Sequence, residues 1–203
     1  MISIRGGGSA TAPFPRHARD SSYHRLRRDE ASLRIVGGKF AGRDLTSPAE
    51  SRVRPTAEHV RAAILDVLTA DVPKARVLDL FAGTGALGLE ALSRGAQSAD
   101  FVEFRPSSLH ALRANVAALR VRERTRIFKR DAVQFAAALA EDAYDIAFVD
   151  PPYDSRQLDL VLASWQARGF ARLLVAEHSR AHSLPAGWNR RTFEDTVVTF
   201  YRR

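Results

Sequence analysis

The sequence contains no cysteine and no long hydrophobic run. The lack of cysteine excludes disulfide bonds and thiolate metal sites. Six histidines remain as nitrogen ligands, and we expect no bound metal ion. No segment approaches the roughly 20 consecutive apolar residues that a membrane helix needs, and the first residues form no apolar block of the signal-peptide type. We therefore expect a cytoplasmic protein without membrane contact.

The net charge of +8 is unevenly distributed along the chain. Residues 1–61 hold 12 Lys or Arg and 6 Asp or Glu, whereas residues 62–203 hold 19 and 17. A basic N-terminal part favours a polyanionic partner, because neutralising phosphates releases counterions. A solvated basic surface that only keeps the protein soluble would have the same composition, so charge favours nucleic acid without identifying it.

Three regions follow from composition and patterning. Residues 1–31 are predicted to be a disordered basic tail, because they mix a run of three glycines, two prolines and scattered arginines with few aliphatic residues available for burial. Residues 32–55 are predicted to be an RNA-contacting extension, in which segments 33–36 and 39–46 form a small hairpin. Residues 56–203 are predicted to form the main domain.

Beyond residue 76, strand-like and helix-like segments alternate. The expected strands are residues 76–81, 99–104, 124–129, 144–149 and 173–177, and the expected helices are residues 86–93, 106–119, 132–140 and 157–167. This alternation predicts an α/β fold with a mostly parallel sheet covered by helices on both faces. Residues 190–201 alternate in polarity and are expected to add antiparallel strand at one edge.

A glycine-rich turn follows the first predicted strand. Gly83, Gly85 and Gly88 fit the spacing G-x-G-x-x-G, and Glu103 follows about 20 residues later. This combination of strand, turn, helix and acid favours an adenosine-containing cofactor over an ordinary turn of an α/β domain. The turn residues expected to contact the cofactor are Phe81, Ala82, Gly83, Thr84 and Gly85.

The identity of the cofactor depends on Asp79, which lies four residues before Gly83. A carboxylate beside the turn would repel the pyrophosphate of a dinucleotide, but it can accept a hydrogen bond from an ammonium group. S-adenosylmethionine has an ammonium group and no phosphate, so Asp79 favours that cofactor over a nicotinamide dinucleotide. The alternative is that Asp79 only holds the loop in place.

Two further acids lie at or after the ends of predicted strands. Glu103 ends the second predicted strand, where its carboxylate can accept both ribose hydroxyls. Asp131 follows the third strand and can accept the adenine amino group or cap the helix that begins at Ala132, and both roles can hold together. Asp131 and Ala132 are therefore included among the expected cofactor contacts.

The segment Asp150, Pro151, Pro152 and Tyr153 directly follows a predicted buried strand. The two prolines fix the backbone and remove two N–H donors. The Asp150 carboxylate and the Pro151 carbonyl could then each accept one hydrogen of an exocyclic amino group, and Tyr153 could stack on the base. A rigid turn is the simpler interpretation of the tetrapeptide alone, but its position after the fourth strand favours catalysis by positioning and electrostatics.

The glycine turn and the 150–153 segment together resemble S-adenosylmethionine-dependent enzymes that methylate amino groups. Residues 34–43 (RIVGGKFAGR) and the 54–61 segment, with its Arg-Pro-Thr and Val-Arg pairs, resemble the bacterial family that methylates N2 of one guanine in 16S ribosomal RNA. The resemblance runs from about Leu33 to the C-terminus. It implies a Rossmann-like, seven-stranded methyltransferase fold and a target in the 30S subunit or its assembly intermediate. It also implies that the 150–153 segment holds a flipped guanine while Glu103 holds the ribose.

Basic residues of the N-terminal segments are expected to contact RNA phosphates, although each could equally belong to a solvated basic face. Thr56 is grouped with them and is first expected to cap a helix. No feature suggests an obligate dimer, so we expect a monomer. The expected RNA contacts are Arg34, Lys39, Arg43, Arg54, Thr56 and Arg61.

Three other functions fit parts of the sequence. An adenine-N6 methyltransferase of DNA or RNA shares the Asp-Pro-Pro-Tyr segment, but the chain shows no target-recognition insertion. A nicotinamide dehydrogenase is disfavoured by Asp79, and a non-catalytic RNA-binding assembly factor by the intact 150–153 segment. The chain departs from the family where Arg130 precedes Asp131 and where Phe104 and Arg105 replace a frequent second acid.

Overall fold

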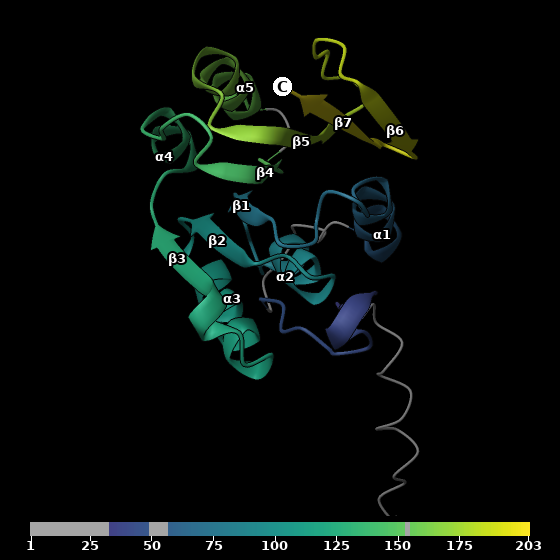
Figure 1. The fold of residues 1–203 in the computed structure, drawn as a ribbon, viewed down its shortest axis with the longest axis vertical. Helices are drawn as coiled ribbons and strands as arrows, with labels where there is room; N and C mark the ends of the chain where they lie inside the picture. The colour runs from purple at the N-terminus through teal and green to yellow at the C-terminus, as the bar shows by residue number, and fades with distance from the viewer. Residues whose placement is uncertain (1–32, 49–56, 153–154) are drawn as a thin grey trace, which may run out of the picture. The chain divides into compact units, whose positions relative to one another are not determined.

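The structure, a computed structural model, describes residues 33–48, 57–152 and 155–203. Seven strands form one sheet in the order β3-β2-β1-β4-β5-β7-β6 (Figure 1). Strands β1 to β5 are parallel, β7 pairs antiparallel with β5, and β6 pairs antiparallel with β7. The strands are β1 (Arg76–Leu80), β2 (Ser98–Glu103), β3 (Thr125–Lys129), β4 (Tyr144–Val149), β5 (Ala171–Ser179), β6 (Asn189–Phe193) and β7 (Thr196–Arg202). The predicted sheet is confirmed, with the C-terminal region split into two strands by a turn at Glu194 and Asp195.

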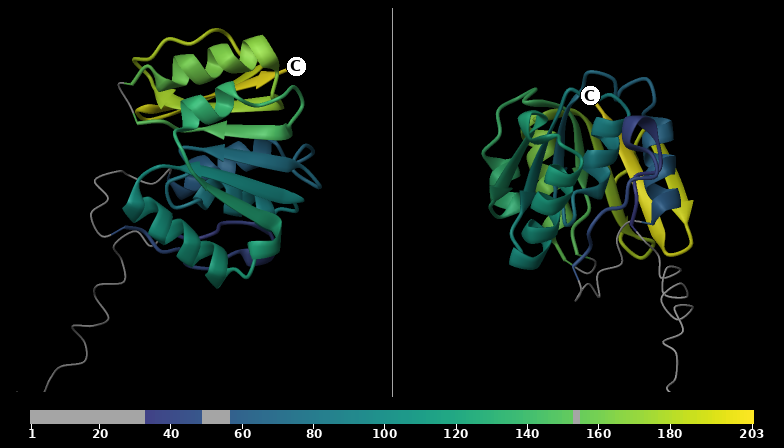
Figure 2. Two further views of the ribbon diagram at one scale, coloured as in Figure 1. Left: turned by 90° about the vertical axis from the view of Figure 1, so that its left-hand side faces the viewer. Right: turned by 90° about the horizontal axis from the view of Figure 1, so that it is seen from below.

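Helices cover both faces of this sheet (Figure 2). One buried cluster joins alternate strand residues, such as Val77 and Phe101, to the first three helices. A second cluster joins the intervening residues, such as Leu78 and Val102, to the last two. The alternation arises because successive side chains of a strand point to opposite faces. The helices are α1 (Glu58–Val67), α2 (Ala86–Ser93), α3 (Pro106–Ala118), α4 (Ala132–Ala137) and α5 (Gln157–Arg168), with short 3-10 helices η2 (Gly38–Phe40) and η3 (Arg122–Arg124).

The described part of the N-terminal extension differs from the expected hairpin. Its antiparallel pairing is limited to one bridge between Arg34 and Asp44, flanked by a few backbone hydrogen bonds. Lys39 lies in the 3-10 helix η2 instead of a strand. Gly38 and Gly42 both adopt a φ of +78°, a backbone conformation that turns the chain and interrupts extended structure.

Polar side chains of α2 fix this extension on the domain. The Glu90 carboxylate is fully buried and accepts hydrogen bonds from the backbone N–H groups of Val36 at 2.8 Å and Gly37 at 2.6 Å. The Ser93 hydroxyl donates to the Gly37 carbonyl at 2.5 Å and accepts from the Phe40 N–H at 2.8 Å. These backbone groups are thus satisfied by side chains of a helix instead of by a second strand.

Asn115 of α3 connects the extension to the glycine turn. Its side chain is buried and exchanges two hydrogen bonds with the Thr46 backbone, at 2.7 and 3.0 Å. The same amide also donates to the Thr84 carbonyl at 2.9 Å. The N-terminal extension and the loop after β1 therefore share one buried amide.

Several predictions concern residues outside the described part. These are the tail of residues 1–31, together with Arg54, Thr56 and Tyr153. In the described residues, helix α1 begins at Glu58 with Ala57 in the N-cap position. Among the helices that the structure describes, none has the length and apolarity needed to cross a membrane.

Candidate active site

The predicted site residues lie where the parallel strands end. Leu80, the last residue of β1, is in register with Val102 near the end of β2 and with Val149 at the end of β4. The chain leaves β1 towards β2 on one side and returns to β4 on the other, so the strand order reverses between β1 and β4. In open α/β sheets, ligands bind outside the carboxyl ends of the strands at this point.

Two of the three glycines, Gly85 and Gly88, are needed for packing, and the third, Gly83, faces open space. A Cβ on Gly85 would lie 2.3 Å from the Leu112 side chain, and one on Gly88 would lie 2.5 Å from the Phe101 ring. A Cβ on Gly83 would meet no atom closer than 3.9 Å. Gly85 and Gly88 are therefore required for close packing, whereas the space beside Gly83 is open to a ligand.

Asp79 lies beneath the turn and is almost fully buried, with an exposed fraction of 4%. Its carboxylate accepts a hydrogen bond from the Gly88 N–H at 2.9 Å, so it does hold the loop. Burial raises the pKa of Asp79 to about 8, and the neighbouring charges of Asp150 and Glu103 act in the same direction against the opposing Gly88 hydrogen bond. A buried carboxyl without a cationic partner favours its neutral form, and an ammonium group beside it would supply that partner.

The raised pKa of Asp79 predicts pH-dependent stability. A carboxyl whose pKa rises on folding stabilises the protein fully below its unfolded pKa of 3.8, and this contribution is lost as the pH rises to about 8. We expect the free energy of unfolding of the wild type to fall by roughly 3–5 kcal/mol relative to Asp79→Asn across this window. Urea unfolding of both proteins at several pH values measures the difference, and a constant difference would contradict the expectation. Asparagine is a matched control, because its oxygen can still accept from Gly88.

Glu103 at the end of β2 already has several donors. Its buried carboxylate accepts the backbone N–H groups of Gly83 at 2.8 Å, Phe104 at 2.8 Å and Arg105 at 2.7 Å. A carboxylate offers about four acceptor positions, so this arrangement leaves room for one further donor. The expected acceptance of both ribose hydroxyls is therefore not available unless one backbone donor moves, and the Gly83 N–H lies beside the open space.

Of the two roles expected for Asp131, the structure shows the helix cap. It is the N-cap of α4, and its side chain accepts from the Gln134 N–H at 2.8 Å. The adjacent Ala132 is buried, and adenine contact by either residue stays a prediction.

Phe104, directly after Glu103, has an exposed fraction of 65%. An exposed aromatic ring directly after Glu103 offers a surface on which a planar base can stack, a role that the sequence analysis did not assign to Phe104.

The proline segment follows β4 at the same edge of the sheet. Asp150 is half-buried and follows Val149, which is paired with Leu80, so it lies at the strand end next to that of Asp79. Its charge contributes to the raised pKa of Asp79. Pro151 is buried and Pro152 is exposed. The Pro152 carbonyl accepts the Ser155 hydroxyl at 2.8 Å, which ties the segment to the chain entering α5.

The expected RNA contacts separate into two groups. Arg34, Lys39 and Arg43 are exposed on the N-terminal extension, and Arg34 forms an ion pair with Glu58 at 3.3 Å. Arg61 is fully buried and donates to the Arg34 carbonyl at 2.6 Å. Burial lowers the pKa of Arg61 against the opposing charges of nearby acids. Its expected phosphate contact is therefore wrong for this structure, because Arg61 supports the extension from within.

The histidines at residues 57–152 and 155–203 show no arrangement typical of a metal centre. His178 and His182 are four residues apart and their rings lie 6.1 Å apart, but His178 interacts with Thr199 at 3.0 Å and His182 with Asp159 at 2.9 Å. Within the described residues, no group of three or more possible ligands has the geometry of a metal site.

Comparison with known proteins adds independent information. The sequence matches the family described as Conserved hypothetical protein 95 over residues 33–201. It is 34% identical to the Ribosomal RNA small subunit methyltransferase D of Escherichia coli K12, covering 77% of this chain and 81% of that protein. A hypothetical protein of Thermus thermophilus has a similar solved structure, with 32% identity, a TM-score of 0.71, and coverage of 84% of this chain and 99% of that one.

A more distant structure shares the fold alone. The 16S rRNA N2 G1207 methyltransferase of T. thermophilus, solved in complex with AdoMet and guanosine, is 19% identical with a TM-score of 0.62. The match covers 85% of this chain and 50% of that chain. This chain therefore shares its overall fold with that protein.

Proposed function

Because the chain belongs to the family described as Conserved hypothetical protein 95, we propose that it transfers a methyl group from S-adenosylmethionine to the exocyclic N2 of a guanine in 16S ribosomal RNA. The observation that supports this most directly is the placement of Asp79, the glycine turn, Glu103 and Asp150 at one edge of the sheet. The relative named Ribosomal RNA small subunit methyltransferase D supports an rRNA substrate.

The residues at this edge fit S-adenosylmethionine. The space beside Gly83 admits a ligand without a Cβ clash, and the buried Asp79 carboxyl lies where an ammonium group would relieve its unfavourable burial. Glu103 retains one acceptor position for a ribose hydroxyl. When bound, the cofactor supplies a methyl group on a sulfonium centre.

The part of this chain in the reaction is to orient and activate the amino group of the base. The lone pair of an exocyclic amino nitrogen is delocalised into the ring, which makes the nitrogen a poor nucleophile. The Asp150 carboxylate and the Pro151 carbonyl would each accept one amino hydrogen and increase the electron density on nitrogen. The nitrogen sheds one proton once it is methylated, so no strong base is required, and catalysis comes from positioning and electrostatics.

The experiment that tests this proposal uses 30S subunits that lack guanine methylation. The purified protein is incubated with radiolabelled S-adenosylmethionine and either these subunits, naked 16S rRNA or duplex DNA, and the label is mapped to the nucleotide. We expect label on N2 of one guanine of 16S rRNA. Label on adenine N6 in RNA or DNA would show that the target base is adenine, while S-adenosylmethionine would stand as the cofactor. If the protein binds the cofactor but labels none of the substrates, a non-catalytic assembly factor would be favoured.

A further inference from the structure

A groove of about 610 Å³ lies outside the candidate active site, at the far end of α3. One wall comes from the N-terminal extension, and the other comes from the end of α3 and the chain leading to β3. Four of the residues that line the groove are cationic and none is acidic: Lys39, Arg43, Arg120 and Arg124.

Neutral groups contact three of these four cationic side chains. The Arg43 guanidinium donates to the Ala118 carbonyl at 3.1 Å, and Arg124 donates to the Gln97 carbonyl at 3.1 Å and to the Ala96 carbonyl. The Lys39 ammonium lies 5.7 Å from the centre of the Phe40 ring. In the part of the chain that the structure describes, none of the four lining cations forms an ion pair with a carboxylate. Their charge therefore remains available to an anionic ligand.

The exposed face of α3 runs between the groove and the candidate active site and carries one arginine, Arg113, and no acid. Helix α3 begins three residues after Glu103 and contains no acidic residue among its 13 residues. Its exposed positions include His110 and Arg113, and Arg120 continues the same spacing just beyond the helix. At 1.5 Å per residue, the helix separates the groove from Glu103 by about 20 Å.

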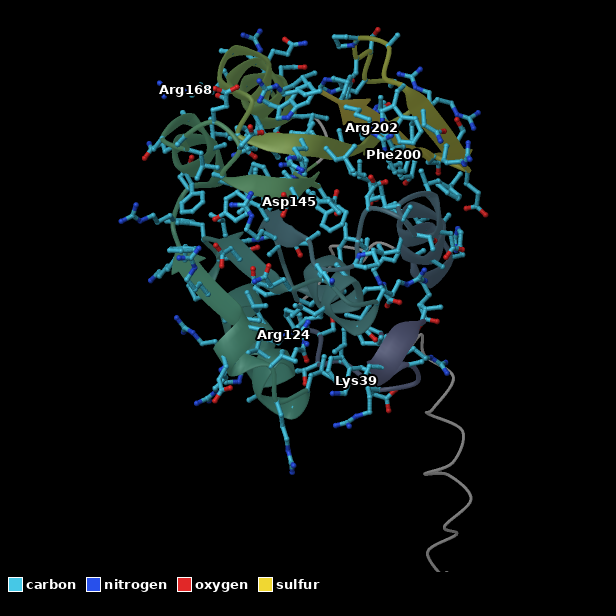
Figure 3. All side chains as sticks on the ribbon, in the orientation of Figure 1. Lys39, Arg124, Asp145, Arg168, Phe200 and Arg202 are labelled. Carbon is cyan, nitrogen blue, oxygen red and sulfur yellow. The ribbon has the colours of Figure 1, made fainter. Side chains whose placement is uncertain are left out.

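We propose that this groove binds the phosphodiester backbone of the substrate RNA, at nucleotides distant from the methylated base. The proposal rests on the proposed function and adds a second binding site to it. A backbone ligand fits because phosphates are contacted by arginine and lysine without base recognition. The exposed face of α3 between the two sites also carries no carboxylate that would repel phosphates. Figure 3 shows Lys39 and Arg124 at the end of the domain that α3 and η2 form.

The test compares two double variants that remove equal charge. Lys39→Gln with Arg120→Gln removes two cations of the groove. Arg168→Gln with Arg191→Gln removes two exposed cations elsewhere: Arg168 ends α5, away from Lys39 and Arg124 in Figure 3, and Arg191 lies on β6, the sheet edge opposite to β3. Binding of a 16S rRNA transcript is measured for each protein between low and moderate salt.

We expect the groove variant to bind the transcript about tenfold or more weakly at ~0.1 M salt, with a salt slope smaller by roughly 1.4–1.8. The control variant should bind like the wild type. Equal affinities for the groove and control variants would overturn the proposal. Each single substitution is also measured, with an expected slope change of about 0.7–0.9, so that a folding defect in one variant cannot mimic the result.

Methyl transfer separates this proposal from the proposed function. If the wild type methylates 16S rRNA and the groove variant has an unchanged KM for RNA, the groove proposal fails and the function stands. If the groove variant loses RNA binding but the wild type methylates no RNA, the groove is an RNA-binding site and the proposed function fails.

Discussion

Replacing Asp150 by alanine is expected to lower the rate constant of methyl transfer by about 10²–10³-fold, the loss typical of removing one preorganised electrostatic group. The expectation follows from the position of Asp150 directly after β4, beside the turn that is proposed to hold the cofactor. Without this carboxylate, one hydrogen of the target amino group loses its acceptor. The nitrogen then keeps its lone pair delocalised and is also held less firmly.

Cofactor affinity distinguishes a catalytic role from a structural one. The charge of Asp150 raises the pKa of Asp79, so its removal should favour the ionised form of Asp79 and should not weaken the binding of an ammonium group. We expect Asp150→Ala to retain the wild-type dissociation constant for S-adenosylmethionine within about threefold, a difference below 1 kcal/mol.

Asparagine is the matched variant at this position. Its amide oxygen can accept one amino hydrogen but has no negative charge, so Asp150→Asn should have an activity between those of the wild type and Asp150→Ala. Single-turnover methylation of unmethylated 30S subunits at saturating cofactor measures all three. Full activity of Asp150→Ala would show that the carboxylate has no part in the reaction.

The sheet and the location of the site were predictable because both follow from local patterns. Continuous apolar runs, such as residues 146–149, mark strands buried on both faces, and alternation with helices forces these strands to be parallel. Parallel strands bring their carboxyl ends to one edge. Asp79, Glu103 and Asp150 could therefore be placed together from their positions at or directly after the ends of strands, without knowledge of any distance.

The role of the N-terminal extension was not predictable, because its backbone pairs with side chains far along the chain. Glu90 is 53 residues from Gly37, and nothing in the local sequence of residues 33–46 indicates that a helix will supply its acceptors. Arg61 was misjudged for the same reason, since an arginine in a basic segment normally faces solvent. The burial of Asn115 could have been inferred from the sequence, because this polar residue occupies an apolar position of α3 between Leu112 and Leu119.

Replacing Glu103 by alanine is expected to weaken S-adenosylmethionine binding by about 10²-fold, equivalent to the roughly 3 kcal/mol of a strong charge-assisted hydrogen bond. The loss of affinity has two sources. One is the lost hydrogen bond to the ribose, and the other is the glycine turn, which Glu103 organises by accepting the Gly83 N–H. Affinity alone cannot separate contact with the ribose from support of the loop. Glutamine is a poor control here, since its amide NH₂ would face a backbone N–H donor.

Deoxyribose analogues of the cofactor separate the two sources. If Glu103 accepts a ribose hydroxyl, the wild type should bind the 2′-deoxy or the 3′-deoxy analogue about tenfold more weakly than the parent compound, and Glu103→Ala should bind all three equally. Three of about four acceptor positions are occupied by backbone donors, so only one of the two deoxy analogues should show the loss. Equal losses for both analogues would mean that the Gly83 N–H leaves Glu103 when the cofactor binds, and the glycine turn would then move during each catalytic cycle. If the wild type does not discriminate against either analogue, Glu103 supports the loop and does not hold the ribose.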